Sequence, residues 1–262
     1  MPTAEGLRAR LRTLERFDAH AVIRFLRLFG AALVVDVVTE VMAGVWHVHT
    51  GKLYPWRNLG IVPLYPASVL AIEWALRAAA GLMLLMGARH AKVLSAAVRI
   101  AAIVLFVAVL ERYSNHGVLL FLIAFFLTLA PLDVTAPSFS ERDQPALGLV
   151  RAQLAIVYVF SAANKLAHGF AGGHSLSNLF GSALPQGPVA QALSVLVIAT
   201  ELTLPLVLLR WPRVGLAGVV AMHVGFAALV PGVASFGLAM IAMAVLFAAP
   251  SPSRRSSLAL PG

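Results

Sequence analysis

Two polar residues, Asn164 and Lys165, stand near the end of a long apolar run in the middle of the chain. The run covers residues 149–173 and reads LVRAQLAIVYVFSAANKLAHGFAGG, which is long enough to cross a bilayer. A charge in such a run is costly unless it is paired or reaches the interface, so Lys165 is a candidate functional residue. The structural alternative is a lysine that extends its ammonium group to the lipid headgroups.

The residue types in the chain limit the available chemistry to histidine, lysine, asparagine, tyrosine and the carboxylates. The 262 residues include no cysteine, which excludes disulfides, thiolate nucleophiles and metal sites with cysteine ligands. No predicted helix carries histidines or carboxylates at the spacing of a zinc or di-iron site, so no metal is expected. The sequence also lacks a P-loop, a dinucleotide fingerprint and a GxSxG elbow.

Several ionisable residues interrupt the other apolar stretches. Asp36 and Glu40 are four residues apart, so they share one face of a helix. Two acids there would repel each other, and Arg77 or Arg99 from another helix would relieve the repulsion. Glu73 and Arg77 are also four residues apart, and they are expected to pair with each other or with those acids. Structural ion pairing is our preferred interpretation of this group, ahead of a proton relay.

The remaining polar residues are separate candidates. Glu201 has no cation near it in the sequence, so it must face a cavity, stay protonated or reach a distant partner. His223 lies on an apolar stretch, where a lone histidine is more often a hydrogen-bonded packing residue than a ligand. Ser114 or Asn115 would cap the helix that follows, which explains the presence of the asparagine. Capping does not explain why a histidine, His116, comes next.

The composition is that of a membrane protein. Hydrophobic residues make up 60% of the chain, charged residues make up 12%, and the mean hydropathy is +0.87. These values indicate an all-α, polytopic transmembrane bundle that has the lipid bilayer as its partner. In a soluble protein the net charge of +9 would suggest nucleic acid. Here the basic residues flank apolar runs, so they indicate topology and anionic lipid, and no nucleic-acid partner is expected.

About eight apolar spans are predicted, joined by segments that are too short to form a soluble domain. The spans cover residues 23–46, 69–86, 93–110, 117–131, 147–166, 189–209, 214–230 and 233–249. The expected organisation is an interfacial amphipathic helix (1–20), a single transmembrane domain (21–250) and a short cytoplasmic tail (251–262).

The distribution of basic residues predicts the orientation in the membrane. Arginine and lysine concentrate on alternate connections between the spans, and the positive-inside rule then places both termini in the cytoplasm. The protein is therefore expected to be a multi-pass component of the inner or plasma membrane. The same alternation puts His116 and Lys165 near the outer face.

Four stretches of the sequence resemble one known family. The Arg-x-Gln pair at 151–153 and the run IVYVFSAANKL are similar to the LRGQ-IVYFIAGVKKL segment of the vitamin K-dependent gamma-glutamyl carboxylases. The stretches YSNHGVL and RFLRLFGAALVVD are similar to that family's NHSYL motif and first-span signature. The stretch AMHVGFAALVPGVASFGLAMIAMAVLF resembles its histidine-containing penultimate span and its final span. The chain is identified as a member of the broader horizontally transferred transmembrane (HTTM) domain family.

The resemblance implies a reaction and a set of site residues. In the carboxylases, a lysine at the end of this run deprotonates vitamin K hydroquinone. Oxygen addition then yields a strong base that removes a proton from the gamma-carbon of glutamate, with the epoxide as co-product. The matching lysine is Lys165, and the matching histidine, His116, would stabilise the charged intermediate. An apolar pocket suits such a base, because it favours the neutral amine. The cofactor-binding residues implied by the match are Asn115, Tyr158, Asn164 and His223.

Two functions are therefore weighed against each other. One is an enzyme that uses oxygen and a reduced quinone, vitamin K or another menaquinol, to modify a peptide or a small acid. The other is a non-catalytic maturation or immunity partner of a secreted peptide, in which Lys165 and His116 only form hydrogen bonds. After the lysine, the acidic residues of the family are missing, Phe170 replaces its tryptophan and His168 is new.

Overall fold

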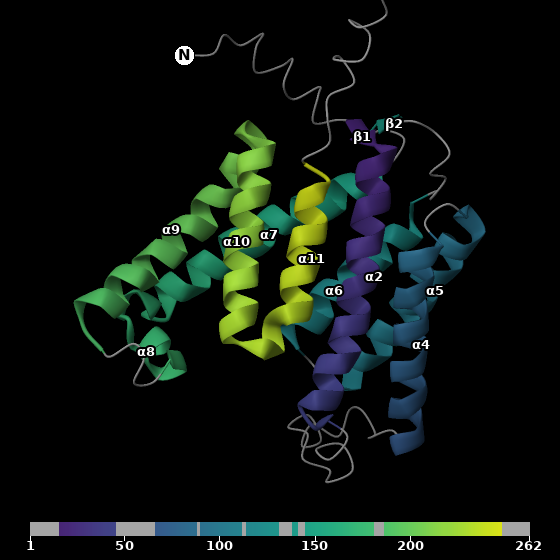
Figure 1. Ribbon diagram of the computed structural model, residues 1–262, viewed down its shortest axis with the longest axis horizontal. Helices are drawn as coiled ribbons and strands as arrows, with labels where there is room; N and C mark the ends of the chain where they lie inside the picture. Colours follow the sequence, from purple (N-terminus) through teal and green to yellow (C-terminus); the bar gives the residue numbers. More distant parts are fainter. Residues whose placement is uncertain are drawn as a thin grey trace, which may run out of the picture.

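Apolar helices make up most of the chain (Figure 1). The computed structural model describes residues 16–45, 66–87, 90–111, 114–130, 138–140, 145–180 and 186–247. Within these residues, the longest helices are α2 (Ala19–Met42), α4 (Ala67–Met86), α5 (Ala91–Glu111), α6 (Asn115–Thr128), α7 (Pro145–Ala167), α9 (Pro188–Arg210), α10 (Pro212–Leu229) and α11 (Ala234–Val245). The short elements are β1 (Arg16–Asp18), β2 (Ser138–Ser140), η2 (Phe170–Gly172), α8 (His174–Phe180) and η4 (Pro231–Val233).

Each of the long helices overlaps one of the predicted spans. In the described part of the chain, four helices are long and apolar enough to cross a membrane, namely α4, α5, α7 and α9. Helices α6, α10 and α11 are also apolar but shorter, and α2 carries charged residues along its length. A helical membrane bundle is thus confirmed, whereas the number of helices that cross completely stays a prediction.

Two predicted regions lie mostly beyond the described residues. The tail (251–262) is outside them altogether. Of the predicted interfacial helix (1–20), only residues 16–20 are described, and they form β1 and the start of α2. The predicted transmembrane domain (21–250) contains all the other elements.

Two helix boundaries follow directly from residues in the sequence. The Ser114 hydroxyl accepts a hydrogen bond from the backbone N–H of Gly117 at 3.1 Å, so Ser114 caps α6 and Asn115 begins it. Helix α2 ends at Met42, before the predicted boundary, because Gly44 adopts a left-handed φ of 71°.

Helix α2 lies between α4 and α11 near the centre of the bundle (Figure 1). Other neighbours are α4 with α5, α5 with α6, α7 with α9, and α10 with α11. The backbones of α2 and α4 approach each other closely at Gly30 and Gly81. A Cβ atom added to Gly30 would lie 2.6 Å from the carbonyl oxygen of Gly81, so this crossing requires glycine.

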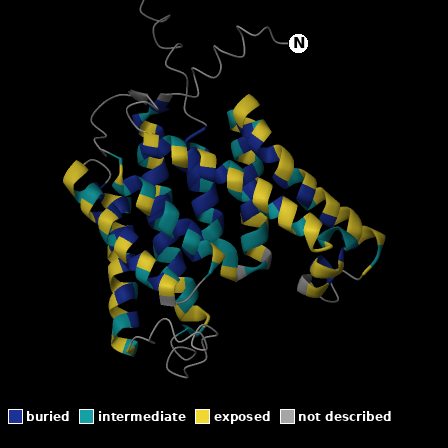
Figure 2. Ribbon diagram, turned by 180° about the vertical axis from the view of Figure 1, so that it is seen from behind, coloured by how far each residue is buried: buried dark blue, intermediate teal, exposed yellow. Residues whose placement is uncertain are grey.

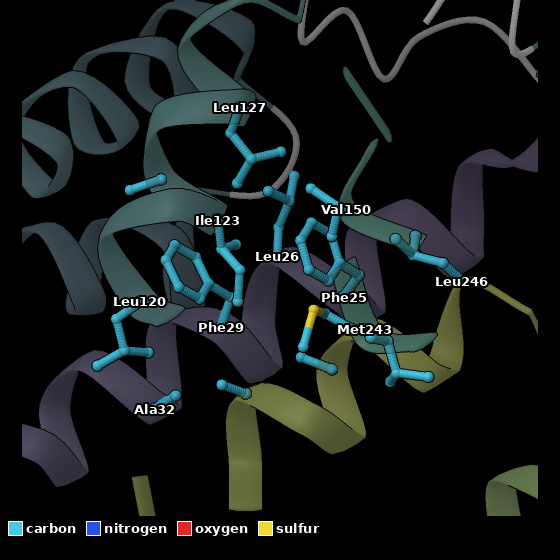
Figure 3. Close-up of a cluster of buried hydrophobic side chains, with 14 of the residues drawn as sticks. Phe25, Leu26, Phe29, Ala32, Leu120, Ile123, Leu127, Val150, Met243 and Leu246 are labelled. Atoms are coloured by element: carbon cyan, nitrogen blue, oxygen red, sulfur yellow. The ribbon is translucent and has the colours of Figure 1, made fainter. Parts of the chain in front are cut away.

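The main hydrophobic core connects α2 with α6, α7 and α11 (Figure 3). Phe25 and Phe29 of α2 stack with their ring centroids 6.3 Å apart. Leu120 and Ile123 of α6 and Met243 of α11 lie around these rings. Exposed residues cover the outward faces of the helices (Figure 2), and many of them are large hydrophobic side chains, as a surface in contact with lipid requires.

A short antiparallel ribbon of β1 and β2 brings the starts of two distant helices to the same end of the bundle. Helix α2 follows β1 directly, and α7 begins a few residues after β2. The ends of α2 and α7, which carry Glu40 and Lys165, therefore lie away from this ribbon. The ribbon thus marks the end of the bundle that is opposite to Glu40 and Lys165.

Candidate functional site

Lys165 lies in the last turn of α7 and turns its ammonium group towards α9. Its Nζ donates hydrogen bonds to Glu201 Oε1 at 2.7 Å, to Glu201 Oε2 at 2.8 Å and to Ser161 Oγ at 2.6 Å. The side chain of Lys165 is 22% exposed and that of Glu201 is 6% exposed. Lys165 is therefore the distant partner of Glu201, and together they form what we call the Lys165–Glu201 pair.

The chain that follows α7 folds back over this pair. Gly169 has a left-handed φ of 70°, a conformation that side chains other than glycine rarely adopt. The turn brings the ring of Phe170 to 5.7 Å from Lys165 Nζ, within the range of a cation–π contact. Gly173 is equally constrained, because a Cβ atom there would lie 2.7 Å from the backbone nitrogen of Gln191 in α9. Gly169 and Gly173 thus allow the backbone after α7 to turn back beside Lys165.

A second pair, Tyr158 and His223, lies deeper in the bundle between α7 and α10. The Tyr158 hydroxyl and His223 Nε2 are 2.9 Å apart, and both side chains are buried. The ring of Phe236 packs edge-on against His223. The next residue, Gly237, has no side chain and so leaves room for His223. Tyr158 stands three residues before Ser161 and seven before Lys165 on α7, so the three side chains share one face of the helix. Two of the implied cofactor residues therefore contact each other and lie next to the Lys165–Glu201 pair.

The acids of α2 form a separate cluster around Arg77 of α4. The Arg77 guanidinium is hydrogen-bonded to Asp36, lies 2.7 Å from Glu40 Oε2 and lies 2.7 Å from Glu73 Oε1. Trp74 Nε1 donates a further hydrogen bond to Glu40 at 2.6 Å. We call this group the Arg77 cluster. The predicted ion pairing is confirmed, with Arg77 as the cation, and its structural role, as opposed to a proton relay, stays a prediction. The other candidate cation, Arg99, is exposed on α5.

His116 adjoins the Arg77 cluster at the start of α6. Its Nε2 atom lies 3.6 Å from Asp36 Oδ1 and 3.4 Å from the Ser114 hydroxyl, and its side chain is one-third exposed. The hydroxyl of Ser235, at the start of α11, donates to the same Asp36 oxygen at 2.8 Å. The neighbouring Asn115 occupies the first position of α6. Asp36 therefore connects the predicted catalytic histidine to three other helices.

The structure distributes the predicted site residues over three places. Lys165 is with Ser161 and Glu201, Tyr158 is with His223, and His116 is with Asp36. Asn164 is exposed, and its carbonyl oxygen is 2.8 Å from His168 Nδ1. In the part of the chain described, no hydrogen bond or ion pair joins Lys165 to His116. Their joint role stays a prediction.

Sequence reasoning did not include Ser161 and Glu201 among the site residues. The four-residue spacing between Ser161 and Lys165 was a usable signal, because it puts both on one helix face. The pairing of Lys165 with Glu201 bridges 36 positions of the chain and has no local signal. Among the described residues, no group of three or more histidines or acids is arranged to hold a metal ion.

An apolar groove of about 270 Å³ lies along the contact between α7 and α9. It is lined by Gly148, Arg151, Ala152, Ala155, Pro205, Leu209 and Phe247. Arg151 is held at its end by hydrogen bonds to the carbonyl oxygen of Leu246, at 3.2 Å from Nε and 2.5 Å from Nη2. The guanidinium also stacks 4.0 Å from the centre of the Phe17 ring. The arginine of the Arg-x-Gln motif thus joins β1, α7 and the residues after α11.

Comparison with known proteins identifies the family of the chain. The HTTM domain family matches residues 15–251, which include every described helix and all three polar groups. No curated protein and no solved structure matches the chain significantly. The family match and the apolar helices make this an integral membrane protein related to the membrane domain of the carboxylases. The chain belongs to the HTTM domain family.

Proposed function

We propose that this protein is a membrane enzyme that deprotonates a reduced quinone at the Lys165–Glu201 pair and uses oxygen to convert it to the epoxide. The observation that carries the proposal is the contact of both Glu201 oxygens with Lys165 Nζ, at 2.7 and 2.8 Å. A peptide or a small acid would be the second substrate, from which the resulting strong base removes a proton.

The geometry of the pair supports a role as proton acceptor. A lysine ammonium cannot take up a proton, but Glu201 can accept one from it through the short hydrogen bonds, which leaves a neutral amine and a neutral acid. In an apolar bundle the ionic form loses the solvation that favours it in water, so the two forms come closer in free energy. Ser161, which donates to Glu201 at 3.1 Å, holds the carboxylate in place during the exchange.

The donor set around the pair fits a quinol. Lys165, Glu201 and Ser161 offer polar atoms to a phenolic hydroxyl, and the Phe170 ring offers a face to an aromatic head group. When bound, the quinol and one O₂ would supply the oxidation: one oxygen atom would enter the epoxide, and the other would leave as water with one hydroxyl hydrogen and the proton removed from the second substrate. Lys165, neutral once its own proton has moved to Glu201, would take the other hydroxyl proton, and the pair would release one proton to water when the reaction is complete.

The experiment uses purified protein in lipid nanodiscs with a reduced naphthoquinone and oxygen, and the epoxide is measured by mass spectrometry. We expect epoxide from the wild-type protein and at least a hundredfold less from Lys165→Ala. Lys92→Ala is the matched control, because Lys92 is exposed at the start of α5 and outside every polar cluster described above. Equal epoxide formation by Lys165→Ala and the control would remove the proposed base.

One observation favours the second candidate function, a non-catalytic partner of a secreted peptide. Lys165 has a complete set of internal hydrogen-bond partners, which is also what a purely structural lysine requires. Folded, monodisperse protein that forms no epoxide from any reduced naphthoquinone would support this role and would overturn the enzymatic one.

A further inference from the structure

One face of α2 is exposed and changes from basic to apolar along the helix. Arg24, Arg27, Ala31, Val34 and Val38 follow one another at alternating spacings of three and four residues, so their side chains share this face. Both arginines and Val38 are exposed, and Ala31 and Val34 are partly exposed. Helices α4 and α11 flank α2 and leave this face uncovered. We call it the open face of α2.

No carboxylate among the described residues pairs with either arginine of the open face. The acids along the contact between α2 and α4 are Asp36, Glu40 and Glu73, and all three are engaged with Arg77. Helix α11, on the other side of α2, contains no ionisable residue. The two arginines carry like charges on one helix face and repel each other. They therefore need an anion from beyond the described residues.

The two arginines lie near the membrane surface at the ribbon end of the bundle. The ribbon of β1 and β2 has open edges, which do not occur within the hydrocarbon region, so Ala19, directly after β1, lies at the interface. With a rise of about 1.5 Å per residue, Arg24 and Arg27 lie about 8 and 12 Å along α2 from Ala19. Arginine side chains extend towards the surface while their methylene groups stay in the apolar region. Both guanidinium groups thus reach the depth of the lipid headgroups.

Phosphate is the anion that a bilayer supplies at this depth. A guanidinium group offers a planar fork of N–H donors that matches the oxygen atoms of a phosphate. Cβ atoms three residues apart on a helix are about 5–6 Å from each other, so both forks reach the oxygens of one phosphate. A zwitterionic headgroup would bring its own ammonium close to the two arginines, whereas an anionic headgroup brings no positive charge. The pair of arginines therefore favours an anionic lipid.

From these observations we propose that the open face of α2 binds one anionic glycerophospholipid, with its phosphate between Arg24 and Arg27 and an acyl chain along Ala31, Val34 and Val38. The lipid belongs to the leaflet at the ribbon end of the bundle. Because α2 lies between α4 and α11, the bound lipid stabilises the centre of the bundle by neutralising the two arginines. This lipid site is independent of the proposed enzymatic function, and its tests require no turnover.

The first test measures the preference for the headgroup. Delipidated protein in detergent receives phosphatidylglycerol or phosphatidylcholine with the same acyl chains. Native mass spectrometry follows lipid retention, and thermal unfolding gives Tm. We expect at least fivefold more retention of phosphatidylglycerol and a rise in Tm that is at least 5 °C larger. The double variant Arg24→Gln with Arg27→Gln should lose both differences. Glycerol phosphate, which has no acyl chain, should leave Tm unchanged.

The matched control is the double variant Arg210→Gln with Arg213→Gln. These two arginines are also exposed, three positions apart and at the same end of the bundle as the ribbon, but they belong to different helices, α9 and α10 (Figure 1). The control should keep both differences. Equal losses in the two double variants would overturn the proposal. So would equal retention of the two lipids by the wild-type protein, or a full rise in Tm with glycerol phosphate.

The second test locates the acyl chain in the wild-type protein, without any substitution. A phosphatidylglycerol with a diazirine in the middle of one acyl chain is irradiated with the protein in nanodiscs of phosphatidylcholine. We expect labelled peptides that include residues 31–38, with labelling reduced at least fivefold by excess unlabelled phosphatidylglycerol. Labels spread over the apolar helices, with no competition by unlabelled phosphatidylglycerol, would show contact with bulk lipid only and would overturn the proposal.

Discussion

Glu201 stands 36 positions after Lys165 in the chain, yet both of its carboxylate oxygens lie within 2.8 Å of the lysine Nζ. Each charge is acceptable within the bundle because the other is present, since an isolated charge in an apolar environment is far more costly than a pair. The pair is consequently a structural requirement as well as a candidate site, and mutations must separate the two roles.

A double-mutant cycle separates the charges from the chemistry. Glu201→Leu alone leaves Lys165 without its counter-ion, and we expect a loss of about 3 kcal/mol of stability, at the lower end of the range for buried pairs because Lys165 is partly exposed. The double variant Lys165→Met with Glu201→Leu should recover most of this loss. Thermal unfolding in detergent, followed by fluorescence, measures the two single variants, Glu201→Leu and Lys165→Met, and the double variant. Strictly additive effects would show that the two residues do not stabilise each other.

Arg77 is the cation on which three carboxylates depend, so its loss should be the most damaging single change in the bundle. We expect Arg77→Met to yield little monodisperse protein, because Asp36, Glu40 and Glu73 would then repel one another in an apolar environment. Arg77→Lys should rescue only part of the yield, because a lysine lacks the planar fork that reaches several acids. Size-exclusion chromatography measures the yield.

Arg99→Met is the control for the Arg77 variants, because Arg99 is exposed on α5. Its effect on stability should stay within about 0.5 kcal/mol, as is usual for surface substitutions. A wild-type yield of Arg77→Met would contradict the account of the Arg77 cluster.

The crossing of α2 and α4 should not accept a side chain larger than hydrogen at Gly30. In Gly30→Ala the new Cβ atom would lie 2.6 Å from the Gly81 carbonyl oxygen, and the helices must separate to relieve this contact. We expect a loss of about 1–3 kcal/mol, as for other overpacked sites. Gly225→Ala is the control, because its Cβ atom would meet nothing within 4 Å. If both variants unfold at the same temperature, the close approach is not needed.

The positions of the helices could be predicted from the sequence, because apolar runs and their polar interruptions are local features. The cap at Ser114 and the break at Pro231 and Gly232 were predictable for the same reason. The ribbon of β1 and β2 was not, because strands of three residues carry no detectable periodicity. Gly44, which ends α2 early, lies in an apolar run that otherwise continues.

The candidate site was predictable only in part. The spacing of Glu73 and Arg77 favoured their pairing, but the choice between Arg77 and Arg99 depended on which helix face is buried. Family motifs singled out Lys165 and His116 as separate residues. Their partners, Glu201 and Asp36, come from other helices, and such contacts are fixed by tertiary packing.

Substitution of His116 distinguishes the predicted electrostatic role in catalysis from a purely structural role. We expect His116→Asn to lower kcat for epoxide formation about a hundredfold, as for removal of a donor that stabilises a developing anion, with little change in KM. The thermal unfolding temperature should change little, because Arg77 still neutralises Asp36. His168→Asn is the control, because His168 is exposed after the last turn of α7. An unchanged kcat would assign His116 to the Arg77 cluster alone.

The orientation of the bundle can be tested directly, because the chain has no cysteine of its own. Single cysteines at the exposed positions His168 and Arg213 report on opposite ends of the predicted topology. In intact cells, a membrane-impermeant maleimide should label His168→Cys and should leave Arg213→Cys unlabelled until the cells are lysed. Lys92→Cys is a second inside position and should behave like Arg213→Cys. Labelling of Lys92→Cys and Arg213→Cys in intact cells, with protection of His168→Cys, would reverse the orientation and move Lys165 to the cytoplasmic side.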